Sequence, residues 1–240
     1  MQTAMNDAEL ARRSILGFGE MLAALGRWGA GTGAEVRWPN ALGARIDAAA
    51  GNHWFDAVVV PPDAVPPDDD PRLPYCVWSV AGAVSGRIEN AGIATPCMAM
   101  TLEDPAPGLD ADAPNFERPT LTVLGEINER AYGDPTGIFT SLVQEIRDQR
   151  VRTYGLRDGS VFVCVALTLT VGDDVGIHYV ATEASHRRRG LASRLLLDML
   201  AAAKSNGMRS ATLLASPDGL SIYRGLGFRQ VATLRGYVRP

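Results

Sequence analysis

The sequence predicts an α/β protein, in which strands and helices follow one another along the chain. Apolar runs of strand length occur at residues 177–182 and 211–215. Between them, residues 191–203 place apolar side chains at helical spacing, and Asn206-Gly207 follows as a helix stop. With 240 residues, 46% of them hydrophobic, the chain can build the core of one large domain or of two small ones.

The first half of the chain has a similar pattern, divided by two proline-rich stretches. Residues 61–74 and 105–119 combine prolines with acidic residues and are expected to be loops or linkers. Around them we expect a helix at residues 7–25, strands at 55–60 and 75–80, a helix-like stretch at 83–90 and an alternating strand at 97–102.

The second half is more regular. Two helices are expected at residues 121–132 and 137–149, separated by Gly133-Asp134-Pro135. An antiparallel pair follows at 151–156 and 161–171, closed by Arg157-Asp158-Gly159. Strand, helix, strand, helix and a last strand at 230–238 complete the predicted order.

An arginine-rich turn, His-Arg-Arg-Arg-Gly-Leu-Ala at residues 186–192, connects the strand at 177–182 to the helix at 191–203. Backbone N–H groups at the positive end of a helix bind phosphate well. Gly190 allows a ligand to approach the backbone closely. The alternative is a solvated loop, since three arginines in a row often have no other role.

Two motifs in this part of the chain resemble those of the GNAT superfamily of acyl-CoA-dependent N-acetyltransferases. Arg187-x-x-Gly190-x-Ala192 is similar to the family's coenzyme A pyrophosphate loop, and Tyr223-Arg-Gly-Leu-Gly-Phe228 to its second signature. The resemblance implies a GNAT fold, with a central mixed, mostly antiparallel sheet flanked by helices. It further implies a catalytic domain at residues 116–240, preceded by a smaller, degenerate GNAT-like α/β region at residues 1–115 on the substrate side.

The resemblance also implies which residues bind acetyl-CoA, or another acyl-CoA, as co-substrate. The main chain of Val180, Ala181 and Thr182 is expected to bind the carbonyl and the pantetheine arm. Ser216 is a further candidate contact, and a helix-capping role for it is equally open. The pyrophosphate is assigned to the backbone amides of Arg188, Arg189, Gly190, Leu191, Ala192 and Ser193, with the side chain of Arg187, Arg188 or Arg189 supplying positive charge.

Transfer of an acyl group to an amine also needs an acid for the departing thiolate. Tyr223 is the candidate, because its phenol is close in acidity to a thiol. The alternative is a core aromatic residue with a satisfied hydroxyl.

A general base is harder to assign. Many relatives place a glutamate four residues before the position of Val180, where this chain has Gly176. His178 is the candidate instead, because simple alternation places it on the same strand face as Val180 and Thr182. A partly buried histidine without a catalytic role is equally open, Glu126, Glu129 and Glu183 are further options, and an amine that is already neutral needs no base.

Composition excludes several classes of protein and site. A net charge of −4 argues against a nucleic-acid binder. The apolar stretch at residues 15–25 is too short to span a bilayer and the first residues lack a signal-peptide pattern, so we expect a cytoplasmic protein without a membrane partner. Scattered cysteines suit reduced, buried thiols, and no metal site is expected from Cys76, Cys97, Cys164, His53, His178 and His186.

The sequence has few features that identify the acceptor substrate, and we expect a small-molecule amine by default. Trp54, Tyr75 and Trp78 are candidate walls of its site. Three alternatives stay open: a longer acyl group, a donor carried on an acyl carrier protein that docks on the arginines, and a non-catalytic acyl-CoA sensor. A monomer or a homodimer is expected. A nucleotide-binding fold is discounted, because the loop lacks the glycine patterns of that class.

Overall fold

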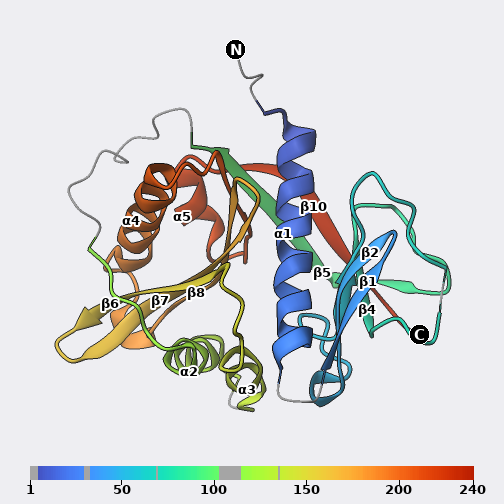
Figure 1. The fold of residues 1–240 in the computed structure, drawn as a ribbon, viewed down its shortest axis with the longest axis horizontal. Helices are drawn as coiled ribbons and strands as arrows, with labels where there is room; N and C mark the ends of the chain where they lie inside the picture. The colour runs from blue at the N-terminus through green and yellow to red at the C-terminus, as the bar shows by residue number, and fades with distance from the viewer. Residues whose placement is uncertain (1–4, 30–32, 69, 103–114, 135) are drawn as a thin grey trace.

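A ten-stranded sheet with helices on both faces makes up the protein (Figure 1). The computed structural model describes residues 5–29, 33–68, 70–102, 115–134 and 136–240. The strand order is β1-β2-β3-β4-β10-β5-β9-β8-β7-β6. Two neighbouring pairs, β3–β4 and β8–β9, are parallel and the others are antiparallel. The predicted mixed, mostly antiparallel sheet is therefore confirmed.

The first half of the chain supplies one long helix and five strands. The helix begins where the Asn6 side chain accepts a hydrogen bond from the Glu9 amide at 2.9 Å. Asp7 and Glu9 add negative charge to its first turn. The elements are α1 (Asp7–Trp28), β1 (Gly33–Trp38), β2 (Ala41–Ile46), a 3-10 turn (Asp47–Ala49), β3 (Ala57–Val59), β4 (Cys76–Ser79) and β5 (Ile88–Thr101).

The second half confirms the predicted order of elements. Thr120 caps α2 by accepting from the Val123 amide at 3.2 Å, and Gly133 ends this helix at φ 70°. The elements are α2 (Leu121–Tyr132), α3 (Ile138–Val143), β6 (Val151–Asp158), β7 (Val161–Val171), β8 (Asp174–Thr182), a 3-10 turn (Ala184–His186), α4 (Leu191–Ser205), β9 (Ser210–Leu214), α5 (Leu220–Gly225) and β10 (Arg229–Val238).

Three local predictions were wrong or incomplete. The stretch at 83–90 is not a helix: Gly86 turns the chain at φ 68°, and β5 begins at Ile88. The helix predicted at 137–149 ends at Val143: the Ile146 amide bonds the Val143 carbonyl at 3.1 Å in a tighter turn, and Asp148 accepts from the Arg150 amide at 3.0 Å in a further local turn. Strands β1 and β2 were not predicted.

The two halves of the chain share the sheet. β5 lies between β9 and β10, with Cys97 opposite Leu214 on one side and Ile88 opposite Val238 on the other. α1 lies across the sheet and contacts strands from both halves, among them β2, β3, β8 and β9 (Figure 1). A domain boundary at residue 115 stays a prediction, but the residues on either side of it belong to one sheet.

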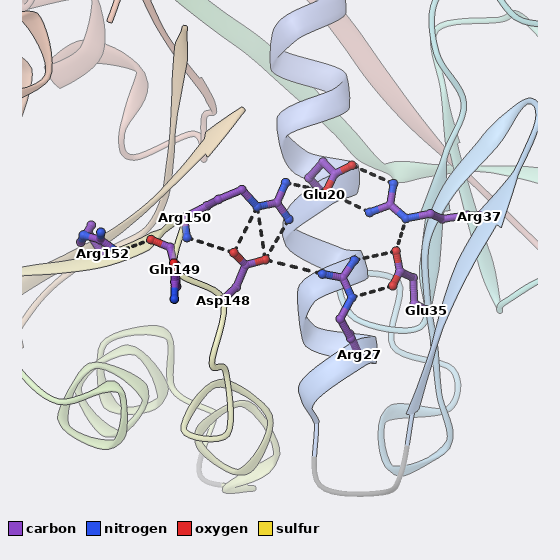
Figure 2. A network of polar contacts seen from close by, with 8 residues as sticks. All are labelled: Glu20, Arg27, Glu35, Arg37, Asp148, Gln149, Arg150 and Arg152. Atoms are coloured by element: carbon purple, nitrogen blue, oxygen red, sulfur yellow. Dashed lines mark hydrogen bonds and ion pairs between the residues drawn. The ribbon is translucent and has the colours of Figure 1, made fainter. Parts of the chain in front are cut away.

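Ion pairs fasten α1 to the second half of the chain. Figure 2 shows acidic and arginine side chains that alternate from β1, through α1, to the segment before β6. Glu20 of α1 pairs with Arg37 at 2.8 Å and with Arg150 at 3.0 Å. Arg150 in turn pairs with Asp148 at 2.8 Å. The network thus joins three segments that are distant in the sequence.

The two faces of the sheet have separate cores. α1, α2 and α3 pack on the face that carries Val165, Leu167 and Ala181. α4 and α5 pack on the face that carries Cys164, Val175 and Ile177. The three cysteines are free and buried, as predicted. No helix in the described ranges is long and apolar enough to cross a membrane.

A buried carboxyl group lies under α1. Asp174 is 2% exposed and accepts hydrogen bonds from Ser210 at 2.5 Å and Thr212 at 2.7 Å. Burial raises the pKa of Asp174 from 3.8 to about 6. The folded protein therefore binds this proton more tightly than the unfolded chain does.

The stability that Asp174 contributes is consequently present below pH 4 and lost as the pH rises through 6. We expect Asp174→Asn, which keeps partners for both hydroxyls, to remove this loss. The free energy of unfolding of the wild type relative to the variant should fall by up to about 3 kcal/mol between pH 4 and pH 7. Urea denaturation of both proteins across this range measures the difference; a difference that does not change with pH contradicts the assignment.

Candidate functional site

Strands β8 and β9 part in the middle of the sheet. Their parallel pairing runs from Asp174 opposite Ser210 to Ile177 opposite Leu213 and ends there. Just beyond this point β8 has a bulge, in which Tyr179 and Val180 together lie opposite one residue of β7. Tyr179 adopts a φ of 54°, which is uncommon for a residue with a side chain. The bulge turns β8 away from β9 and opens the sheet.

The bulge overturns the predicted position of His178. His178 pairs with Leu167, whose side chain packs with α2 and α3. Val180 and Thr182 lie on the other face, where Val180 packs in the α4 core and Thr182 Oγ1 donates to Cys164. Simple alternation fails because Tyr179 adds one residue to the strand. His178 therefore does not share a face with Val180 and Thr182.

The parted edge of β8 presents main-chain carbonyl groups that other segments cover. Asn128 of α2 donates to the Tyr179 carbonyl at 3.1 Å, and the Tyr132 hydroxyl donates to the Val180 carbonyl at 3.1 Å. Arg187 Nε donates to the Thr182 carbonyl at 3.2 Å, and the same guanidinium binds the Ala131 carbonyl. Of the expected pantetheine contacts, Val180 and Thr182 thus face the gap, while Ala181 is buried opposite Val165 of β7.

The arginine-rich turn leads from this gap into α4. Gly190 is the residue before the helix and adopts φ 73°, and Arg188 adopts φ 60°. No side chain in the described part of the protein caps α4, so the first amides of Leu191, Ala192 and Ser193 are open to a ligand. Arg189 donates to the Ser185 carbonyl at 3.1 Å. The Arg187 guanidinium is hydrogen-bonded to the main-chain carbonyls of Thr182 and Ala131 and does not point toward these amides.

A cavity of about 570 Å³ opens at the parting of the strands. Its walls come from both halves of the chain and from both faces of the sheet. The lining residues are Phe18, Asn52, Trp54, Phe55, Gly92, Ile93, Ala94, Thr95, Asn128, Glu129, Tyr132, Asp134, Phe139, Ile177, His178, Tyr179, Val180, Leu214, Ala215, Ser216, Pro217 and Tyr223.

Tyr223 lines this cavity from α5 and is 8% exposed. Its ring lies over Gly219, where a Cβ would come within 2.7 Å of Tyr223 Cε2. Burial raises the pKa of the Tyr223 phenol, so the group stays protonated at neutral pH. The phenol is therefore a weaker acid than the sequence suggested, where its acidity was expected to be close to that of a thiol.

His178 lines the same cavity. Its Nε2 atom is buried and has no hydrogen-bond partner among the described residues. A Cβ on Gly176 would lie 2.9 Å from this atom, so the absence of a side chain at Gly176 makes room for the imidazole. Burial lowers the pKa of His178 to about 4, and the ring is neutral at pH 7.

The other candidate bases have structural partners or lie outside the cavity. Glu129 lines the cavity, but its carboxylate accepts from the Thr140 amide at 2.9 Å and from the Thr140 hydroxyl at 2.7 Å. Glu183 pairs with Arg130 at 2.8 Å. Glu126 is exposed and borders a separate, shallow pocket. Within the described ranges, no three His, Cys, Asp or Glu side chains are grouped to hold a metal ion.

The remaining candidates divide between the cavity and the core. Ser216 lines the cavity, as expected for a cofactor contact. Its Oγ accepts from the Gly219 amide at 3.3 Å in the turn before α5, but Gly219 is the N-cap of that helix and α5 has no side-chain cap among the described residues, so the helix-capping alternative is not borne out. Trp54 is in the wall. Trp78 lies behind Trp54 with ring centroids 5.0 Å apart and is fully buried, and Tyr75 packs in the same core.

Sequence reasoning missed Asn128, Tyr132 and Tyr179. Asn128 is 3% exposed, and its Oδ1 is buried without a partner in the described part of the chain. A polar residue on the apolar face of the predicted helix was a signal that could have identified it. No sequence signal marks the bulge at Tyr179.

Comparison with known proteins agrees with this geometry. The sequence model of the acetyltransferase (GNAT) domain matches residues 149–230, from before β6 to the start of β10. No curated protein sequence matches the chain.

Two solved structures are similar over nearly the whole chain, and a third over about two thirds of it. A GCN5-related N-acetyltransferase from Kribbella flavida has a TM-score of 0.62 at 18% identity, covering 99% of this chain and 97% of its own. A protein described as a GNAT-family acetyltransferase from Novosphingobium aromaticivorans has a TM-score of 0.56 at 19% identity, covering 94% and 93%. N-myristoyltransferase from Saccharomyces cerevisiae, solved with myristoyl-CoA, has a TM-score of 0.51 at 13% identity, covering 68% and 50%.

At these identities the likeness between structures concerns the fold, while the domain match concerns the sequence itself. The matched segment contains the parted strand β8, the arginine-rich turn and Tyr223. Residues 149–230 therefore match the acetyltransferase (GNAT) domain, and the chain has the fold of the GNAT proteins it resembles.

Proposed function

We propose that this protein transfers an acyl group, acetyl by default, from an acyl-CoA to the amine of a small molecule. The observation that carries the proposal is the parting of β8 from β9, which opens a cavity in the sheet, in the same strand–turn–helix segment that ends in the uncapped start of α4. An extended thioester arm and a pyrophosphate need these two features next to each other.

The open amides at the start of α4 suit a pyrophosphate. At Gly190, which has φ 73°, no atom of the described residues lies within 4 Å of an added Cβ, which leaves room for a ligand in front of the turn. Arg188 and Arg189 are exposed on the same turn and add positive charge. Arg187 acts differently in this proposal: it holds β8 and α2 together at the edge of the site.

Tyr223 is placed to protonate the leaving thiolate. Its ring lines the cavity at the parting, near the carbonyl edge of Val180. Because its pKa is raised, the hydroxyl carries its proton at every pH near neutrality. In the proposed reaction the neutral amine nitrogen bonds to the thioester carbon, the carbon–sulfur bond breaks, and Tyr223 supplies a proton to the leaving sulfur. The proton that the nitrogen loses passes through water and restores the Tyr223 phenol, so that the products are the amide and free CoA.

His178 is a weak candidate for accepting the amine's proton. Its lowered pKa makes the neutral imidazole a poor base, although it remains able to accept a hydrogen bond. The site therefore favours an amine that reaches it already neutral.

Binding of acetyl-CoA tests the phosphate site. We expect wild type to bind acetyl-CoA with micromolar affinity in calorimetric titration, and Arg189→Glu and Gly190→Asp to bind at least about tenfold more weakly, because each places a carboxylate at the anion site. Arg45→Glu, on β2 at the far side of the sheet, is the charge-matched control and should bind normally. No binding by a folded wild type would favour a carrier-protein donor.

Turnover tests the role of Tyr223. Tyr223→Phe should lower kcat by about 100-fold or more, since it removes the proton donor, while acetyl-CoA affinity stays the same. Tyr154→Phe is the matched control, because Tyr154 is equally buried in the same core but does not line the cavity. Equal kcat values for the two variants would remove Tyr223 from the mechanism.

The charge state of His178 is open to direct measurement. With a pKa of about 4, its ring signals should not shift between pH 5.5 and pH 8 in NMR spectra. A spectrum of His178→Gln identifies the signal. A midpoint near pH 6.5 would instead mean that the imidazole is accessible to water and able to act as a base.

A further inference from the structure

The cavity that would receive the amine is rich in aromatic rings. Seven of the 22 described residues that line it carry a phenyl, phenol or indole ring, whereas aromatic residues make up 7% of the chain. These residues are Phe18, Trp54, Phe55, Tyr132, Phe139, Tyr179 and Tyr223.

The rings form two connected groups that meet at neighbouring residues. Trp54 packs against Phe18 at 6.3 Å between ring centroids. The next residue, Phe55, stacks on Phe139 at 5.6 Å and an angle of 8°, and Phe139 contacts Tyr179 at 4.4 Å. The chain from Trp54 to Phe55 therefore joins both groups at the wall of one cavity.

This part of the cavity lies on the α1 face of the sheet. Phe18 belongs to α1, and Phe139 and Tyr179 belong to the core that α1, α2 and α3 form. Tyr223 and Val180 approach from the α4 face instead. The aromatic groups are thus on the opposite face of the sheet from α4, whose start is the proposed pyrophosphate site.

Charge is scarce in the same lining. The carboxylates among the described lining residues are Glu129 and Asp134. Glu129 is bound to Thr140, and Asp134 accepts from the Thr136 amide at 3.1 Å and hydroxyl at 2.7 Å. A polyamine with several positive charges would find few free partners here.

Neutral polar atoms are present. Asn128 Oδ1 and His178 Nε2 are both buried and lack hydrogen-bond partners within the described ranges, and both residues line the cavity. Buried polar atoms without partners are costly, which favours a ligand that can pair with them. An amino group can donate to the Asn128 oxygen.

We propose that the acceptor is an amine with a planar aromatic body, which contacts Trp54 and the Phe55–Phe139–Tyr179 group while its nitrogen lies toward the parting of β8 and β9. This inference rests on the proposed acyl transfer and specifies its acceptor. Aromatic rings pack on one another with favourable edge and offset contacts, which suits an aromatic acceptor.

The test compares amines in a CoA-release assay with acetyl-CoA. The aromatic probes are 2-phenylethylamine and 4-methoxyaniline, and the non-aromatic probes are spermidine and ethanolamine. We expect kcat/KM at least about tenfold higher for the aromatic pair. A preference for spermidine or ethanolamine overturns the inference and leaves the acyl transfer standing.

Trp54→Ala examines the wall itself. KM for 2-phenylethylamine should rise about tenfold, with acetyl-CoA affinity unchanged. Trp28→Ala is the matched control, because Trp28 is 38% exposed and Trp54 39%, but Trp28 is not in the cavity. An equal rise in KM for all four amines would mean that Trp54 does not select aromatic acceptors. A change in preference from acetyl-CoA to octanoyl-CoA would mean that the rings contact the acyl chain instead of the amine.

Binding separates the two proposals. If no amine is acetylated, 2-phenylethylamine is titrated calorimetrically into the CoA-loaded wild type and Trp54→Ala proteins. Binding that the variant loses supports the aromatic site and counts against the transferase. No binding to the wild type counts against the aromatic site.

Discussion

The parting of β8 from β9 is the constraint on which the site depends. A parallel pair inside a sheet normally satisfies its main-chain groups by continued pairing, and here that pairing ends after Ile177. The protein covers the exposed carbonyl groups with the side chains of Asn128, Tyr132 and Arg187. Asn128 and Tyr132 both belong to α2, so the opening of the sheet depends on the position of that helix.

The helix α1 and its ion pairs support the region in which β8 and β9 part. α1 contacts β8 and β9 as well as β2 and β3, and its residue Phe18 lines the cavity at the gap. Isolated surface ion pairs contribute little to stability. The network of Figure 2 is better placed, because the Glu20 and Asp148 side chains are 13% and 7% exposed. It fastens α1 to the segment that leads into β6.

The second half of the fold was predictable, because its helices and strands have clear apolar periods and strong stops such as Gly133 and Asn206-Gly207. The motif residues near the gap, His178, Val180, Ser216 and Tyr223, were also found in one cavity. The face of His178 was wrong, since one residue in a left-handed conformation reverses a strand's alternation and leaves no trace in composition. Of the aromatic groups, Trp54 was a candidate wall residue, but Phe18, Phe55 and Phe139 could not be assigned to the cavity, because they reach it only through tertiary packing.

The place of β5 in the sheet has a consequence for folding kinetics. β5 separates β9 from β10, and its partners Leu214 and Val238 lie far from it in the sequence. Contacts between distant residues close large loops and form slowly. Until β5 docks, β9 and β10 each present an unpaired edge, and such edges are where chains pair with the wrong neighbour. Refolding of this protein is therefore governed less by its helices than by the insertion of one strand.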